Sequence, residues 1–247
     1  MPAVRRVGHK GADLLAPGNT QEAFAAAADV GVDMLEFDVL SAELDGTGEL
    51  FLAHDYGDLQ RRPDALTLQE GLAHLAEDAY AGLELDVDLK LPGYELRVLD
   101  ALRRHGLLDR ALICSAYPAS LRALRAAAPE VRLGFSYPNL RSDPTTRSGT
   151  KYAAIAVAEV ARRVLPTVLA RRLRRGEFDA VMIHWRLMSP RLLRAVRAAG
   201  GELYVWTVDD PALVSSLVTI GVDGVITNDP RLFTPRDPGP RPAPSGT

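Results

Sequence analysis

The chain has 247 residues, enough for a single barrel or for one to two smaller domains with a large apolar core. Its 29 Lys and Arg residues nearly balance 32 Asp and Glu residues, so the net charge of −3 gives no global reason to expect nucleic acid as a partner. Cys114 is the only cysteine, which excludes an intramolecular disulfide and a cysteine-rich zinc site.

The N-terminal stretch MPAVRRVGHKG is basic but lacks the apolar segment of a secretory signal. No uninterrupted apolar run in the chain reaches membrane-spanning length either. We therefore expect a soluble, cytoplasmic protein.

The pattern of strands and helices predicts an α/β fold. A strand at residues 5–9 is followed by a loop and by a helix at residues 20–30, for which Asn19 is the expected N-cap. The further strands of this pattern are expected at residues 34–40, 83–89, 111–115, 132–136, 180–184, 203–208 and 223–226. Segments of helical period lie between most of them, at residues 94–104, 119–127 and 190–199 among others. An eightfold βα alternation indicates a closed (βα)8 TIM barrel.

One strand does not fit this alternation. Residues 49–54 follow the second strand through a Gly-containing turn and not through a helix, so we expect an accessory strand at the mouth of the barrel. Residues 1–233 are expected to form one domain. The tail TPRDPGPRPAPSGT at residues 234–247 is rich in Pro and has almost nothing apolar to bury, so we expect it to be disordered.

Two further segments are unusual. Residues 136–150 form a long polar loop after the fifth barrel strand, which makes them a candidate lid or substrate collar. Residues 152–175 combine an apolar series with six arginines. We expect a pair of outer helices broken near Pro166 with a solvated basic face; the alternative interpretation is weak contact with an anionic membrane surface.

Carboxylates gather on one face of the second strand. Because strand side chains alternate, Glu36 and Asp38 share the face that points into a barrel whose apolar residues face the helices. Like charges at this distance repel unless a positive group lies between them, and a divalent cation with oxygen ligands satisfies that need. His54 brings a proton carrier to the same end of the barrel.

The next barrel strand, LELDVDLK, repeats the pattern. Glu84, Asp86, Asp88 and Lys90 fall on one face, and Asp88 is the natural third metal ligand because it lies near the strand's C-terminal end. Lys90 would meet an anionic substrate. Glu84 and Asp86 would lie deeper, where each should have a partner or be protonated. Three carboxylates without a thiolate favour a hard cation, Mg²⁺ or Ca²⁺.

An ordered set of short motifs runs through nearly the whole chain. The motifs are VGHKG at residues 7–11, PGNT at 17–20, GVDMLEFDV at 31–39, AHD at 53–55, DLK at 88–90, VWTVDD at 205–210 and GVDGVITNDP at 221–230. Together they resemble the glycerophosphodiester phosphodiesterase family. The resemblance implies a TIM-type barrel that carries a divalent-cation phosphodiesterase. The residues that it carries over are the catalytic pair His9 and His54, the metal ligands Glu36, Asp38 and Asp88, the partner lysine Lys90 and the pocket residue Trp206.

This sequence departs from the family pattern in three places. Lys10 stands where the family usually has arginine, so a point charge would replace a bidentate phosphate contact. Gly18 stands where the family usually has glutamate, and we expect Lys10 and Gly18 to form one changed polar pair, unless the glycine serves a positive φ. Asp88 replaces the usual glutamate, which makes the site more similar to the sphingomyelinase D relatives. Independently of the resemblance, His184 also ends a strand and is a candidate pocket residue.

These residues favour metal-dependent hydrolysis of glycerophosphodiesters, the deacylated phospholipids, to glycerol 3-phosphate and an alcohol. One histidine would accept the proton of the nucleophile, which is water or a neighbouring substrate hydroxyl, and the other would protonate the leaving alkoxide. A phospholipase D-like activity on lysophospholipids or sphingolipids is one alternative, and a non-catalytic anion-binding barrel is another. In each case the expected partner is a small anionic molecule or lysolipid.

Overall fold

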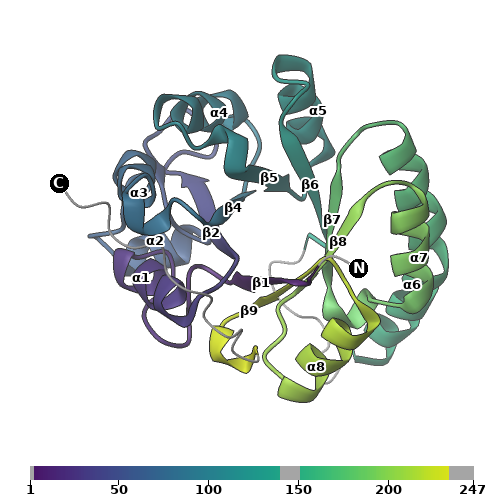
Figure 1. The fold of residues 1–247 in the computed structure, drawn as a ribbon. Helices are drawn as coiled ribbons and strands as arrows, with labels where there is room; N and C mark the ends of the chain where they lie inside the picture. The colour runs from purple at the N-terminus through teal and green to yellow at the C-terminus, as the bar shows by residue number, and fades with distance from the viewer. Residues whose placement is uncertain (1–2, 140–150, 234–247) are drawn as a thin grey trace.

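The computed structural model describes residues 3–139 and 151–233, which form a closed barrel of eight parallel strands surrounded by helices (Figure 1). Strand β1 closes the barrel because it pairs in parallel with both β2 and β9. The barrel strands are β1 (Arg5–Gly8), β2 (Met34–Ser41), β4 (Glu84–Leu89), β5 (Ala111–Ser115), β6 (Arg132–Tyr137), β7 (Ala180–His184), β8 (Glu202–Trp206) and β9 (Gly224–Thr227). The predicted TIM barrel is confirmed.

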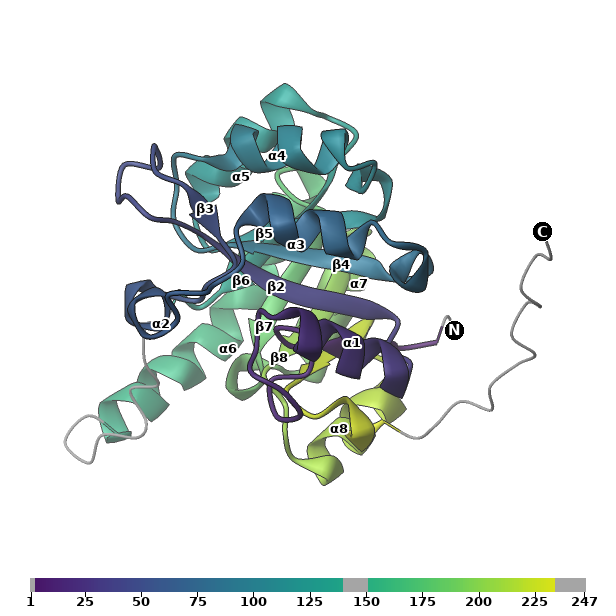
Figure 2. The same ribbon diagram turned by 90° about the vertical axis from the view of Figure 1, so that its left-hand side faces the viewer.

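The accessory strand is also confirmed, but it is shorter than expected. β3 (Leu50–Phe51) pairs antiparallel with the end of β2 and adds a ninth strand outside the barrel. Figure 2 shows β3, α2 and the beginning of α6 at one end of the barrel, which is the end where β2 finishes. The expected disordered tail and most of the expected polar lid, residues 140–150, lie outside the described residues.

The helices pack around the strands. They are α1 (Gln21–Val30), α2 (Tyr56–Arg61), α3 (Leu68–Leu75), α4 (Glu95–Arg104), α5 (Pro118–Ala127), α6 (Lys151–Arg174), α7 (Pro190–Ala198) and α8 (Pro211–Ile220). The expectation that Asn19 caps α1 is wrong. Thr20 is the N-cap, and its side chain accepts a hydrogen bond from the Ala23 N–H. Asn19 adopts a φ of 60° just before the cap, and its side chain is buried.

The prediction of a helix pair broken near Pro166 is wrong as well, because α6 runs through that residue without interruption. A proline inside a helix costs a backbone hydrogen bond, and the apolar face of α6, with Leu165 and Leu169 buried, compensates for it by packing. Val160, Val164 and Val168 are exposed along another face. Contact of this face with a membrane surface stays a prediction. Among the described residues, none of the helices combines the length and the apolar composition that a membrane crossing requires.

The strands bury apolar side chains on both faces, as in other parallel sheets covered by helices. On β2, Leu35, Phe37 and Val39 face the helices and belong to the larger core cluster. Met34 faces inward and belongs to a smaller cluster inside the barrel. The other members of the inner cluster are Val7, Leu112, Cys114, Ala180, Met182, Tyr204 and Ile226. The barrel is therefore packed with side chains below the level of the acidic residues.

A ring of ion pairs closes the N-terminal end of the barrel. Arg5 and Arg132 each contact both Glu84 and Glu202, with N to O distances of 2.7 to 3.4 Å. These four residues begin β1, β4, β6 and β8, which are alternate strands of the barrel and thus form one layer of its interior. Two positive and two negative charges balance in this layer. The expectation that Glu84 has a charged partner is confirmed.

The ring predicts an acid-sensitive contribution to stability. Burial disfavours the charged form of Glu84, but the hydrogen bonds from Arg132 and Arg5 outweigh it and lower the pKa of Glu84. A folded-state pKa below the unfolded value means that the contribution is present at neutral pH and is lost as the pH falls below the ordinary range of a glutamate and through the lower folded-state pKa. Glu84→Gln should lower the free energy of unfolding by about 1 kcal/mol at pH 7 and by less at pH 3.

Urea titrations at the two pH values measure this effect. Glu130→Gln is the matched control, because Glu130 is an exposed glutamate that forms an ion pair with Arg103 outside the ring. Equal losses in the two variants would contradict a special role for the ring.

Candidate active site

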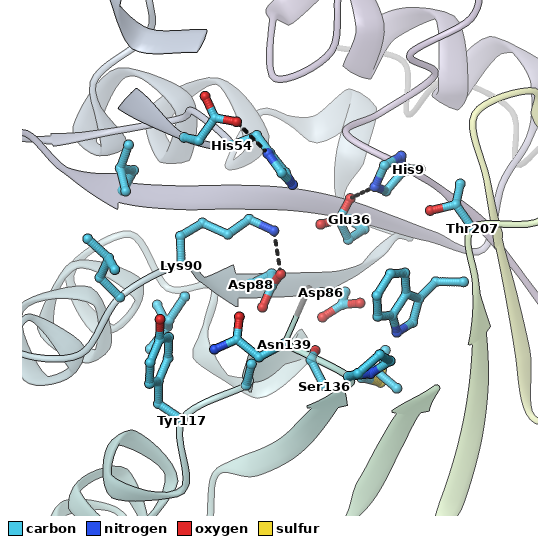
Figure 3. Close-up of a pocket in the computed structure, with 18 of the residues that line it drawn as sticks. His9, Glu36, His54, Asp86, Asp88, Lys90, Tyr117, Ser136, Asn139 and Thr207 are labelled. Carbon is cyan, nitrogen blue, oxygen red and sulfur yellow. Dashed lines mark hydrogen bonds and ion pairs between the residues drawn. The ribbon is translucent and has the colours of Figure 1, made fainter. Parts of the chain in front are cut away.

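The candidate active site is a cavity of about 530 Å³ at the C-terminal ends of the barrel strands (Figure 3). His9, Glu36, His54, Asp88 and Lys90 line it. In Figure 3, His54 and Lys90 lie on one side of Glu36 and His9 lies on the other. Strand direction explains this gathering, because residues at the carboxyl ends of parallel strands meet at one face of a closed barrel.

Three carboxylates form a compact cluster at the bottom of the cavity. Glu36, Asp38 and Asp88 each offer an oxygen, and these oxygens lie within 4.8 Å of one another. Asp38 pairs with Asp88 in the register of β2 and β4, so neighbouring strands bring the two carboxylates together. The Lys90 Nζ lies 2.5 Å from Asp38 Oδ1 and 2.6 Å from Asp88 Oδ2.

Burial and repulsion act on this cluster. Burial, followed by the charge of Asp38, raises the pKa of Glu36 well above its usual range. Burial also opposes the charge on Asp38, but Lys90 and the neighbouring His54 together lower its pKa. For Lys90, burial is outweighed by Asp38, Asp88 and Glu36, which raise its pKa, so the ammonium stays charged. Because acids outnumber the ammonium and all donors are hard oxygens, the cluster fits a divalent cation.

His9 is held in one orientation by a chain of hydrogen bonds. The Asn228 amide nitrogen donates to Asp209 Oδ2 at 2.6 Å, which leaves Asn228 Oδ1 as the acceptor for His9 Nδ1 at 2.5 Å. His9 Nδ1 therefore carries the proton, and Nε2, 3.8 Å from a Glu36 oxygen, carries the lone pair. Burial, followed by the charge of Lys10, lowers the pKa of His9, which favours the neutral ring. A neutral histidine in this tautomer can accept a proton through Nε2.

His54 lies at the rim of the cavity on the segment between β3 and α2. Its Nδ1 is 3.2 Å from Asp55 Oδ2, and its backbone N–H donates to Asp58 Oδ2 at 3.2 Å. Asp55 also caps α2 through the Asp58 N–H. The short helix thus fixes the position of His54, and the Asp55 carboxylate favours a proton on Nδ1.

The loop between β1 and α1 orients two members of the acidic cluster. The Lys10 backbone N–H donates to Glu36 Oε2 at 2.7 Å. The Asn19 side-chain amide donates to Asp38 Oδ2 at 2.9 Å, and its oxygen accepts the Asp38 N–H at 3.1 Å. These bonds hold each carboxylate by one oxygen, so the other oxygen can face the cavity.

The proposed pairing of Lys10 with position 18 needs correction. Lys10 Nζ contacts Asp13 Oδ2 at 3.5 Å, and Asp13 Oδ1 accepts the Gly18 N–H at 2.9 Å. A carboxylate from Asp13 thus stands beside Lys10 and Gly18. A Cβ at Gly18 would lie 2.6 Å from Asp13 Oδ1 and 2.8 Å from Lys10 Cβ. Steric exclusion, and not a positive φ, accounts for the glycine, because the positive-φ glycines of the described residues do not include Gly18.

Trp206 lines the cavity as expected, whereas Lys10 and His184 are not among its lining residues. His184 packs edge-on against Trp206, with ring centroids 5.1 Å apart, and its Nδ1 accepts the Arg186 N–H. It therefore supports the tryptophan from the side. A direct substrate contact from Lys10 or from His184 stays a prediction.

Asp86 lies below the acidic cluster and lines the floor of the cavity. It is 2% exposed, and its Oδ1 has no hydrogen-bond partner. Burial raises the pKa of Asp86 to about 7, although a hydrogen bond with Cys114 partly opposes the shift. The raised pKa favours the protonated form of Asp86, in line with the expectation for a buried carboxyl group.

Arg62 connects the two loops that carry the histidines. Its guanidinium donates to the Gly18 carbonyl and, at 2.7 Å, to the Leu52 carbonyl. Arg62 Nε also lies 3.8 Å from Asp58, the residue that accepts the His54 N–H. The Arg62 side chain thus connects two segments. One is the β1–α1 loop, which donates hydrogen bonds to the acidic cluster, and the other is the segment that contains His54.

Sequence reasoning missed several residues that support the site. The sequence predicts a helix cap at Asn19 and indicates no role for Arg62, Asp209 or Asn228, although the last two lie within the motifs VWTVDD and GVDGVITNDP. The hydrogen-bond partners described above are 10 to 219 positions away in the chain, so no local spacing indicates them.

Fold and site together define a TIM-barrel enzyme with an acidic catalytic mouth. The profile of the glycerophosphoryl diester phosphodiesterase family matches residues 81–232. A glycerophosphodiester phosphodiesterase of Caldanaerobacter subterraneus subsp. tengcongensis is 24% identical over an alignment of 257 positions, gaps included. The alignment covers 91% of this chain and 93% of that protein. One from Arabidopsis thaliana is 29% identical over 91% of this chain and 70% of its own.

Solved structures agree in fold. A phosphodiesterase from Oleispira antarctica, solved in complex with its product sn-glycerol-3-phosphate, superposes with a TM-score of 0.67 at 21% identity and covers 94% of each chain. The chain belongs to the glycerophosphoryl diester phosphodiesterase family, and its activity is that of a glycerophosphodiester phosphodiesterase.

The role of Arg62 predicts a local effect on activity. Arg62→Ala should release the His54 segment from the β1–α1 loop and lower kcat about tenfold or more, because a small misplacement of a reacting group is costly. Steady-state kinetics on glycerophosphocholine measure the effect. Arg62→Lys should keep more of the wild-type kcat than Arg62→Ala. Arg61→Ala is the matched control, since the neighbouring Arg61 side chain is 71% exposed. Similar losses in Arg61→Ala and Arg62→Ala would argue against the connection.

Proposed function

We propose that the protein hydrolyses glycerophosphodiesters to glycerol 3-phosphate and an alcohol in a reaction that depends on a divalent cation and on His9 and His54. The observation that carries this proposal is the placement of two histidines on either side of a buried carboxylate cluster with Lys90. The product bound to the Oleispira antarctica phosphodiesterase supports the choice of products.

Glu36, Asp38 and Asp88 would hold the cation. When bound, a divalent cation would neutralise charge on a non-bridging phosphate oxygen, which favours attack at phosphorus. Lys90 would add positive charge beside the phosphate as charge develops in the transition state. Asn19 and the Lys10 backbone N–H would keep the carboxylates oriented throughout.

His9 is the better base and His54 the better acid. The neutral His9, with its lone pair on Nε2, would accept the proton of the attacking oxygen, whether that oxygen belongs to water or to the substrate's neighbouring hydroxyl. Asn228 and Asp209 would stabilise the protonated ring. His54, which lies beside the Asp55 carboxylate at the rim, would protonate the leaving alkoxide.

A non-catalytic anion-binding barrel accounts poorly for these residues. Such a protein needs positive charge in its pocket, whereas the centre of this cavity contains three acidic side chains, Glu36 among them, beside the single ammonium of Lys90. The phospholipase D-like alternative would use the same residues at the centre of the cavity. Its substrate carries a hydrocarbon chain, so the walls of the cavity, and not its centre, would decide between the two activities.

The first test is removal of the metal. Because three hard oxygen ligands hold the cation, dialysis against excess chelator should abolish release of glycerol 3-phosphate from glycerophosphocholine. Mg²⁺ or Ca²⁺ should restore the activity, and Zn²⁺ should restore it poorly. Full activity in excess chelator would exclude the metal from the mechanism.

The second test concerns the histidines. His9→Ala and His54→Ala should each lower kcat roughly 100-fold or more, within the range of general acid–base catalysis. The double variant should lose much less than the product of the two single losses, because both residues serve one proton-transfer cycle. His105→Ala is the control and should keep full activity, because His105 lies at the C-cap of α4 and contacts Gln69. Independent, multiplicative losses would argue against a shared cycle.

A further inference from the structure

The residue at the start of α4 is unusual for its position. Tyr94 is the N-cap of this helix, a place where Ser, Thr, Asp and Asn are preferred because their short side chains accept a hydrogen bond from the first turn. The Tyr94 side chain makes no such bond. It is 1% exposed, and its hydroxyl binds backbone groups outside α4 instead.

The Tyr94 hydroxyl connects the ends of two barrel strands. It donates a hydrogen bond to the Val39 carbonyl of β2 at 2.6 Å and accepts one from the Leu91 N–H, just beyond β4, at 3.0 Å. Burial raises the pKa of Tyr94, so the hydroxyl keeps its proton and remains a donor at neutral pH. One buried side chain therefore bridges β2 and the segment that leaves β4.

Both backbone partners of this hydroxyl lie next to members of the reacting centre. Val39 directly follows Asp38, and Leu91 directly follows Lys90. The register of β2 with β4 ends at Val39, whose carbonyl also accepts the Lys90 N–H at 3.1 Å. Because a carbonyl oxygen can accept two hydrogen bonds, Tyr94 extends the connection one residue beyond the end of the strand pairing.

The backbone at Lys90 sets where its ammonium can lie. The Lys90 Nζ is 2.5 Å from Asp38 Oδ1 and 2.6 Å from Asp88 Oδ2, and Figure 3 shows the side chain reaching from the end of β4 toward Asp88. Misplacing a reacting group by about 1 Å can cost on the order of 100-fold in rate. A bond that fixes the backbone beside Lys90 therefore matters for the reaction.

We propose that Tyr94 is a positioning residue for the reaction, because its hydroxyl fixes the backbone next to both Asp38 and Lys90 and thereby the place of the ammonium. This inference rests on the proposed function, since Lys90 is the group through which Tyr94 acts. Tyr94 is not among the residues that line the cavity, so it does not touch the substrate.

The first test removes the hydroxyl and keeps the buried ring. Tyr94→Phe should lower kcat for glycerophosphocholine about tenfold and change KM less than about twofold, because Lys90 acts mainly on charge that develops in the transition state. Tyr80→Phe is the matched control. Tyr80 is also buried, at 3% exposed, and its hydroxyl contacts His74 Nε2 outside the cavity. Both variants should lose some thermal stability, but Tyr80→Phe should keep its kcat.

A spectroscopic measurement follows Lys90 directly and needs no turnover. Lys10, Lys90 and Lys151 are the only lysines of the sequence, so protein labelled with ¹³C-lysine gives a simple NMR spectrum. The Lys90 signal is identified by its loss in Lys90→Arg. It should shift in Tyr94→Phe and keep its wild-type position in Tyr80→Phe.

The outcomes separate this role from the proposed function. If the wild-type protein hydrolyses glycerophosphocholine with Mg²⁺ or Ca²⁺ but Tyr94→Phe keeps its kcat, the positioning role is wrong and the proposed function stands. Equal losses of kcat in Tyr94→Phe and Tyr80→Phe would also overturn the role, as would a lower kcat with an unshifted Lys90 signal. No turnover by the wild-type protein with either cation would overturn the proposed function and the role together.

Discussion

The structure depends on the balance of charge inside the barrel. Glu36, Asp38, Asp86 and Asp88 project inward from two neighbouring strands whose register places them side by side. Burying several carboxylates together is unfavourable because they lose hydration and repel one another. Lys90 offsets part of this repulsion, and the raised pKa of Asp86 favours its neutral form. The arrangement of the remaining carboxylates suits a divalent cation. The same acids that strain the interior also supply the chemistry.

The two ends of the barrel differ in how their buried charges are balanced. At the N-terminal end, two arginines and two glutamates form a neutral ring, and apolar residues fill the interior above it. At the C-terminal end, negative charge exceeds positive charge among the residues that line the centre of the cavity. The first arrangement is self-sufficient and stabilises the fold. The second leaves an excess of carboxylates, which suits a divalent cation.

Loops outside the strands turn this charge into a directed site. The β1–α1 loop orients Glu36 and Asp38, the Asp209–Asn228 pair sets the tautomer of His9, and Arg62 ties the loop to the segment of His54. Each connection joins residues distant in the chain.

The sequence by itself determined the barrel, because period-two and helical patterns are local and the eightfold alternation permits few other folds. It also determined Glu36, Asp38, Asp88 and Lys90 as one group, since alternation along two strands places them on one face. Only the tertiary structure decided that Asn19 binds Asp38 and that Asp13 accompanies Lys10. It alone placed His184 behind Trp206, since loops and distant strands meet only when the barrel closes, and no local period records those contacts.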